Sequence, residues 1–232
     1  MPSGPTRVTT DPGSRGTVLL LHGGMSDEAP WQPVAAALEQ RFRVALIRRR
    51  LYRLDLPVDP LTAMADQVTE VLDTARGSGR PCVVVGHSSG AIVALEALSA
   101  EPELFAGGVL YEPPSPLDGL PLAAPTTVRR ARDALARRHP GRALQIFLRE
   151  AVQLPWSVSS LAPVMTLIPG VRRYVARQID DLDSIVRLGV RTEVYGRIEL
   201  PVWFLTGERS PRHLGERCTR LAETLPSAEL VT

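Results

Sequence analysis

A short turn at residues 86–90, with the sequence GHSSG, holds the side chains best suited to do chemistry. It follows Val83–Val85, a run typical of a buried strand in a parallel sheet. It precedes Ala91–Leu98, a run of good helix formers with one charge, which predicts a buried helix. Its two glycines permit a sharp reversal because neither has a Cβ that would collide with the neighbouring backbone. This G-x-S-x-G pattern predicts a nucleophile elbow with Ser88 at its tip; the alternative is a Gly/Ser-rich connection that only joins a strand to a helix.

Strands and helices alternate along both ends of the chain. An apolar run at Gly16–Leu21 ends abruptly in His22-Gly23-Gly24. Further strands are expected at Arg43–Ile47, Gly108–Tyr111, Pro201–Leu205 and Ala228–Val231, and the segments between several of them have helical periodicity. This alternation predicts βαβ units and a parallel sheet.

The pattern changes between Pro116 and Glu199, where helical segments follow one another without a convincing strand. We expect helices at roughly 126–139, 141–153, 171–179 and 181–188. An all-helical insert of about 116–199 between two strands of one sheet predicts a cap over the carboxyl ends of the strands, inside a single domain that spans 1–232.

Several segments in this order resemble the α/β-hydrolase superfamily: Leu20–Gly24, the turn at 86–90, Leu110–Pro114, the helical insert and Pro201–Glu208. The resemblance covers nearly the whole chain from Val18 onward. It implies an α/β fold, with a mostly parallel central sheet, helices on both faces and an inserted helical cap. It also implies a serine-dependent hydrolase of a carboxylic ester or thioester that works through an acyl-enzyme, without identifying the acyl group.

The resemblance gives the two turns complementary roles. Ser88 would attack a carbonyl carbon. The backbone N–H groups of Gly24 and Ser89 would stabilise the negative oxygen that forms, and Met25 could share this role.

The acid position departs from the family's commonest pattern. The commonest place for the acid holds Ser210, whose hydroxyl cannot carry the charge that stabilises an imidazolium. Glu112 occupies the other place that the family uses, after the preceding strand, and is the predicted orienting carboxylate. The alternative for Glu112 is a local cap or a partner for an arginine.

The expected base is the larger departure. The family's histidine follows the last strand, and the sequence ends at Val231-Thr232, so the segment that carries this histidine is expected to be missing. Three explanations stay open: a truncated form of a longer protein, a catalytically silent or repurposed fold (a lyase, a cyclase or a small-molecule binder), or another histidine in the base's place. His213 is the candidate for that place, against its interpretation as an exposed histidine at a helix start. Without a base, Ser88 would hydrolyse esters very slowly or not at all.

Composition limits cofactors and partners. The net charge of +2 gives no electrostatic case for nucleic acid, and no segment approaches the roughly 18 apolar residues that span a bilayer. The two cysteines have no metal-ligand spacing, and the sequence shows no cluster of metal ligands and no phosphate-cradling loop, so no metal or organic cofactor is expected. We therefore expect a cytoplasmic protein with a small-molecule substrate and no nucleic-acid or membrane partner. All 27 basic residues are arginine, which indicates a G+C-rich bacterial genome; those at 129–138 form either a solvated surface or an anion-binding patch.

Overall fold

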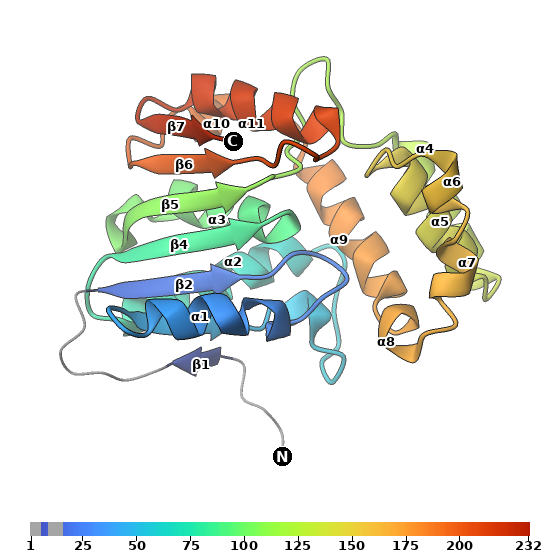
Figure 1. Ribbon diagram of the computed structural model, residues 1–232, viewed down its shortest axis with the longest axis horizontal. Coiled ribbons are helices and arrows are strands. Elements are labelled where there is room, and N and C mark those ends of the chain that lie inside the picture. The colour runs from blue at the N-terminus through green and yellow to red at the C-terminus, as the bar shows by residue number, and fades with distance from the viewer. Residues whose placement is uncertain (1–5, 9–15) are drawn as a thin grey trace.

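The computed structural model describes residues 6–8, by their backbone alone, and residues 16–232. Its seven-stranded sheet has the order β1-β3-β2-β4-β5-β6-β7 (Figure 1). The strands are β1 (Thr6–Val8), β2 (Thr17–Leu21), β3 (Arg43–Ile47), β4 (Cys82–His87), β5 (Phe105–Tyr111), β6 (Val202–Leu205) and β7 (Ala228–Val231). All neighbouring strands pair in parallel except β1, which is antiparallel to β3. The predicted mostly parallel sheet is confirmed, and β1 is an addition that the polar N-terminal sequence did not indicate.

Helices lie on both faces of the sheet. On one face are α2 (Ala63–Gly77) and α3 (Ser89–Ala100), and on the other are α1 (Gln32–Leu38) and α11 (Arg212–Thr224) (Figure 1). Single 3₁₀ turns occur at Ala29–Trp31, Arg50–Tyr52 and Pro102–Leu104. The helix α3 is buried along nearly all of its length, as its sequence predicts.

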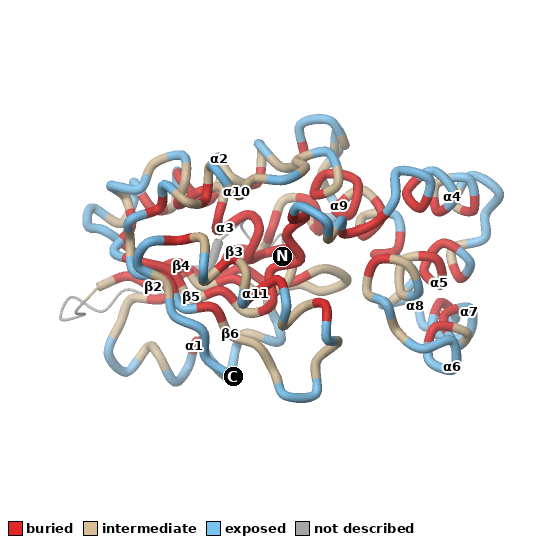
Figure 2. The backbone as a smooth tube through the Cα atoms, turned by 90° about the horizontal axis from the view of Figure 1, so that it is seen from above, coloured by how far each residue is buried: buried red, intermediate tan, exposed pale blue. Residues whose placement is uncertain are grey.

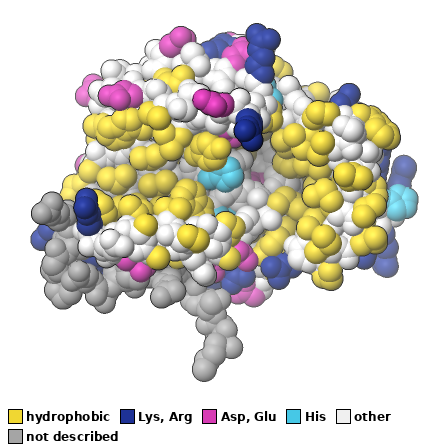
Figure 3. Space-filling model, viewed as in Figure 1, with side chains coloured by type: hydrophobic (Ala, Val, Ile, Leu, Met, Phe, Trp, Pro, Cys, Tyr) yellow, Lys and Arg dark blue, Asp and Glu magenta, His cyan; other side chains and the backbone are white. Residues whose placement is uncertain are grey.

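The face that carries α1 and α11 leaves a strip of the middle strands partly exposed. In β4 the buried side chains of Cys82 and Val84 alternate with the half-buried Val83 and Val85, and Trp203 in β6 is 39% exposed. Apolar side chains are visible along this strip in Figure 3. The prediction that Val83–Val85 is buried on both faces is therefore wrong for this face, because α1 and α11 lie too far apart to cover it completely.

The segment between β5 and β6 is helical, and its one β-feature in the described chain is the isolated bridge Leu117–Leu120. Its helices are α4 (Pro125–Ala136), α5 (Pro140–Glu150), α6 (Trp156–Ser159), α7 (Ala162–Met165), α8 (Pro169–Arg172), α9 (Val175–Leu188) and α10 (Thr192–Tyr195). The helix α9 lies between the carboxyl ends of the strands and the group α4–α8 (Figures 1 and 2). The helices expected at 171–179 and 181–188 merge from Val175 onward into the single helix α9, because no glycine or proline interrupts it, whereas residues 171 and 172 belong to α8. No helix of the described residues has the length and apolar character needed to cross a membrane.

Candidate active site

The turn between β4 and α3 holds Ser88 in a strained backbone conformation. Ser88 has φ 52° and ψ −126°, a region that few residues other than glycine adopt, and its N–H donates to the Tyr111 carbonyl oxygen at 2.8 Å. A Cβ added to Gly86 would lie 2.6 Å from a backbone Cα of α3, and one added to Gly90 would lie 2.4 Å from the His22 carbonyl oxygen. Both glycines are therefore needed where the sequence predicted a sharp turn.

Strained backbone recurs at the same edge of the sheet. Met25, Ser88 and Glu112 have φ values of 55°, 52° and 50°. They follow β2, β4 and β5, which are adjacent strands. The remaining positive-φ residues other than glycine in the described chain, Arg138 and Gln153, lie in the insert. Such conformations persist only where the surroundings enforce them, and they cluster at functional sites.

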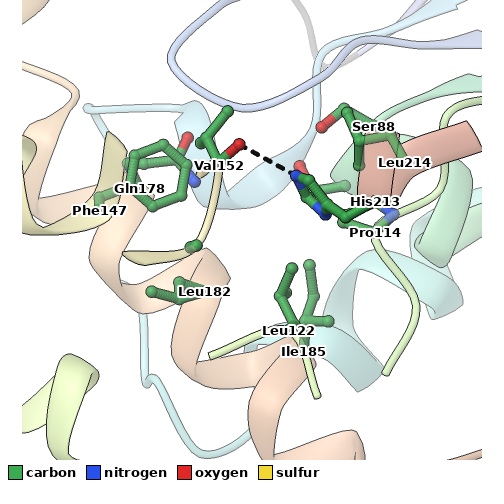
Figure 4. A pocket seen from close by; sticks show the side chains of 12 residues that line it. Ser88, Pro114, Leu122, Phe147, Val152, Gln178, Leu182, Ile185, His213 and Leu214 are labelled. Atoms are coloured by element: carbon green, nitrogen blue, oxygen red, sulfur yellow. Dashed lines mark hydrogen bonds between the residues drawn. The ribbon is translucent and has the colours of Figure 1, made fainter. Parts of the chain in front are cut away.

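A cavity of about 70 Å³ lies beside this turn (Figure 4). Ser88 and Ser89 form part of its wall from the sheet side. Most of the remaining wall is apolar and comes from the insert, including Phe147 of α5 and both Leu182 and Ile185 of α9. The insert therefore covers the serine with an apolar surface.

His213, from α11, lines the same cavity and is only 7% exposed, so it is not an exposed histidine at a helix start. Its Nε2 lies 3.0 Å from the Val152 carbonyl oxygen (Figure 4). Because a carbonyl can only accept, Nε2 carries the proton of the neutral ring. Nδ1 is buried without a partner in the described chain. Burial is the main cause that lowers the pKa of His213, so the ring is neutral at pH 7.

Glu112 lies at the end of β5 and is 7% exposed. Its N–H donates to the Leu205 carbonyl oxygen, and its carboxylate accepts a hydrogen bond from the Gly207 N–H at 3.0 Å. Its negative charge favours protonation of both His87 and His213, although burial outweighs this effect and lowers the pKa of each. Glu112 thus connects the ends of β5 and β6, and the described residues show no hydrogen bond from it to a histidine.

His22, in the other turn, is part of the scaffold. Nδ1 donates to the Gly23 carbonyl oxygen at 2.8 Å, and Nε2 accepts the Arg49 N–H at 3.2 Å. Burial, followed by the charge of Arg49, lowers the pKa of His22 to about 3. A ring with both nitrogens occupied and so low a pKa cannot take a proton from Ser88.

Arg49 is a buried residue beside the site that no sequence pattern indicated. It is 1% exposed and donates to Ser89 Oγ at 2.7 Å, to Gln67 Oε1 at 2.9 Å and to Asp181 Oδ1 at 2.8 Å. It therefore joins the start of α3 to α2 and to α9 of the insert. In the sequence, Arg49 is one of three consecutive arginines, a pattern typical of solvated charge, and nothing local pairs it with Asp181.

Tyr52 extends this buried polar network toward the cavity. Its hydroxyl lies 2.8 Å from Asp181 Oδ2 and 3.1 Å from the side-chain amide of Gln178, which lines the cavity. Burial raises the pKa of Tyr52 well above 10, so the hydroxyl stays protonated. The backbone N–H of Met25 faces the Tyr52 hydroxyl oxygen. A Cβ added to Gly24 would lie 2.0 Å from Gln178 Oε1, so a larger residue there would displace the Gln178 side chain.

Among the predicted site residues, Ser88, Ser89 and His213 meet at one cavity, and Gly24 packs against the cavity residue Gln178. Glu112 lies at the same edge of the sheet, at the end of the strand next to β4. In the part of the chain that the structure describes, no group of His, Cys, Asp and Glu side chains could hold a metal ion.

A serine at the tip of a strained turn between a parallel strand and a buried helix, covered by a helical insert, defines the class of α/β hydrolases. The chain belongs to the alpha/beta hydrolase family, whose model matches residues 18–232. Both the superfamily resemblance and the hydrolase class predicted from the sequence are thereby confirmed.

Solved structures agree with this assignment. An alpha/beta hydrolase from Sphaerobacter thermophilus is 26% identical, with a TM-score of 0.82 over 98% of this chain and 87% of that one. The 2-hydroxy-6-oxo-6-phenylhexa-2,4-dienoate hydrolase of a Rhodococcus species is 21% identical, with a TM-score of 0.67 over 97% of this chain and 84% of that one. A Rhodococcus esterase is 20% identical, with a TM-score of 0.66 over the same shares. The last two show the fold alone. No curated protein sequence matches the chain.

Proposed function

We propose that the protein hydrolyses a small carboxylic ester or thioester through an acyl-enzyme on Ser88. The observation that carries this proposal is the strained turn that holds Ser88 at the wall of a covered cavity. Attack by Ser88 Oγ on the carbonyl carbon breaks the ester or thioester bond, forms the acyl-enzyme and releases the alcohol or thiol, which takes up the proton lost by Ser88. Water then attacks the acyl-enzyme, which releases the acid and returns a proton to Ser88.

The negative oxygen of the tetrahedral intermediate is stabilised by backbone N–H groups. Ser89 is the first residue of α3, where the N–H groups have no partner within the helix and the helix dipole favours negative charge. Gly24 supplies the second N–H from the neighbouring turn. Met25 is the less suitable donor, because its N–H faces the Tyr52 hydroxyl.

His213 is the proton acceptor that we propose for Ser88. Its basic nitrogen is Nδ1, while the Val152 carbonyl holds the proton on Nε2. The charge of Glu112 stabilises the imidazolium, which is the role expected of an orienting acid. Because the described residues show no hydrogen bond from His213 to Ser88, transfer needs a shift of the ring, and we expect slow turnover.

The size and lining of the cavity support a small acyl group. One water molecule occupies about 10–15 Å³ of a cavity measured in this way. The cavity of about 70 Å³ therefore has room for only a few atoms beyond the carbonyl group. We propose that α5 and α9 act as a cap that excludes bulk water from this space.

The test is labelling with a fluorophosphonate probe together with turnover of p-nitrophenyl acetate. We expect the label on Ser88, and we expect Ser88→Ala to abolish both label and turnover. The matched control Ser99→Ala, which removes a hydroxyl on α3 that donates to the Leu95 carbonyl oxygen, should retain both. His213→Ala should lower turnover by about 10² or more. Label at another residue, or turnover that survives Ser88→Ala, would overturn the proposal.

A second candidate is a silent or repurposed fold that binds a small molecule without hydrolysing it. The contact of His213 with Val152 instead of Ser88 favours it. In that case Ser88 stays unlabelled, and a ligand of the cavity binds Ser88→Ala as tightly as it binds the unchanged protein.

A further inference from the structure

The outer part of the insert exposes apolar side chains in one continuous segment. Residues 151–171 contain no charged residue. Their most exposed apolar side chains are Trp156 at 66%, Leu161 at 55%, Val164 at 62%, Leu167 at 77% and Ile168 at 58%. All lie on or beside the short helices α6–α8, and Figure 3 shows apolar side chains over this lobe of the molecule. Apolar patches of this kind usually mark contact with a partner or a membrane.

Exposed arginines flank this segment in the chain. Residues 137–173 contain six arginines, all exposed, and a single acidic residue, Glu150, which pairs with Arg130. One of the six, Arg173, also lies 3.9 Å from the carboxylate of Asp27, and its side chain is 52% exposed. Arg172 and Arg173 directly follow the apolar segment, and Arg149 directly precedes Glu150 and the segment. The protein as a whole carries only +2. The excess of positive charge is therefore local to this part of the insert.

We propose that the exposed surface of α6–α8, with its surrounding arginines, docks on an anionic lipid surface. Apolar side chains that enter the boundary between headgroups and acyl chains, with arginines at the level of the phosphates, give such binding without a spanning helix. A tryptophan such as Trp156 is favoured at that level. The sequence predicts no membrane partner because no segment could span a bilayer, and a peripheral contact of this kind departs from that expectation.

The charge distribution selects this occupant over a second copy of the chain. In a two-fold dimer the same patch meets itself, so Arg172 and Arg173 of one copy would face positive charge of the other. An anionic membrane supplies the opposite charge next to an apolar layer that adapts to the irregular shape of three short helices.

The test is co-sedimentation of the full chain with lipid vesicles. We expect binding to vesicles with about one-third phosphatidylglycerol, little binding to pure phosphatidylcholine, and weaker binding at high salt. In a variant that carries Trp31→Phe and Trp203→Phe, Trp156 is the remaining tryptophan. Its fluorescence emission should shift to shorter wavelength when the protein binds vesicles.

Two pairs of variants separate the patch from the rest of the surface. Arg172→Gln with Arg173→Gln should weaken binding about thirtyfold, since each basic residue near the membrane contributes about 1 kcal/mol. Its control is Arg41→Gln with Arg80→Gln, at exposed arginines outside the insert. Leu167→Ser with Ile168→Ser should weaken binding about tenfold or more, and its control is Leu61→Ser, at a side chain that is 71% exposed outside the insert.

Other outcomes would overturn the proposal. Equal binding to neutral and anionic vesicles, or equal losses in the control variants, would contradict it. A dimer in sedimentation velocity that Leu167→Ser with Ile168→Ser dissociates would assign the patch to a second copy. Binding to polyglutamate as tight as binding to anionic vesicles would assign it to an acidic protein partner. Each of these results leaves the role of Ser88 untouched.

Discussion

The insert faces its surroundings in two opposite ways. Toward the sheet, α9 presents Asp181, which is fully buried against Arg49 and Tyr52. Toward solvent, α6–α8 present apolar side chains such as Leu167, which is 77% exposed. Both arrangements reverse the usual preference for polar groups outside and apolar groups inside. The difference between them is that Asp181 on the buried side has hydrogen-bond partners within the molecule, whereas the outer side leaves large apolar side chains exposed.

The largest expected effect comes from a substitution on the buried side of the insert. Arg49→Leu removes the partner of a fully buried carboxylate, and we expect a loss of about 3–5 kcal/mol in the free energy of unfolding. Urea denaturation of the variant measures this loss. The control Arg172→Leu, at an exposed arginine on α8, should change stability by less than about 0.5 kcal/mol.

A double variant sharpens the same prediction. If the loss comes from leaving Asp181 charged and unpaired, Arg49→Leu with Asp181→Leu should be more stable than Arg49→Leu alone. If the double variant loses as much unfolding free energy as the two single variants together, the two residues act independently.

Acid should weaken the buried network through His22. The unfolded chain binds a proton at this residue below about pH 6.5, whereas the pKa of the folded state is about 3. Stability contributed by the neutral ring is therefore complete above pH 6.5 and falls as the pH falls toward 3. At pH 5 the loss is about 2 kcal/mol.

The measurement is the free energy of unfolding of the unchanged protein and of His22→Gln at pH 7 and pH 5. Because the pKa values of His87 and His213 are also lowered, part of the loss persists in the variant. The difference between the two proteins isolates His22. Identical pH dependence in both would contradict the assignment.

The smallest expected effect comes from the exposed side. Leu167→Ser with Ile168→Ser should change the free energy of unfolding by less than about 0.5 kcal/mol per site, because neither side chain packs in the core. A loss of unfolding free energy near that of Arg49→Leu would contradict this difference between the two sides of the insert.

The sequence is informative where the signal is local. The turn at 86–90 could be predicted because its glycines, its serine and the flanking strand and helix are adjacent in the chain. The all-helical character of the insert follows in the same way from periodicity and breakers. The pairing of Arg49 with Asp181 joins residues 132 positions apart, and no local pattern can indicate it. The burial of His213 likewise depends on Val152 and on how α11 packs against the insert.

The length of chain between Arg49 and Asp181 also affects how the protein acquires its structure during synthesis. Arg49 is separated along the chain from its partner Ser89 by 40 positions and from its partner Asp181 by 132 positions. At the usual rate of about 5–20 residues per second, Asp181 is made roughly 7–26 s after Arg49. During that interval the first half of the sheet can form, but the Arg49 guanidinium cannot be buried without leaving its charge unpaired. The nascent N-terminal half must therefore keep Arg49 hydrated until α9 emerges, and the ion pair between Arg49 and Asp181 can form only after that point.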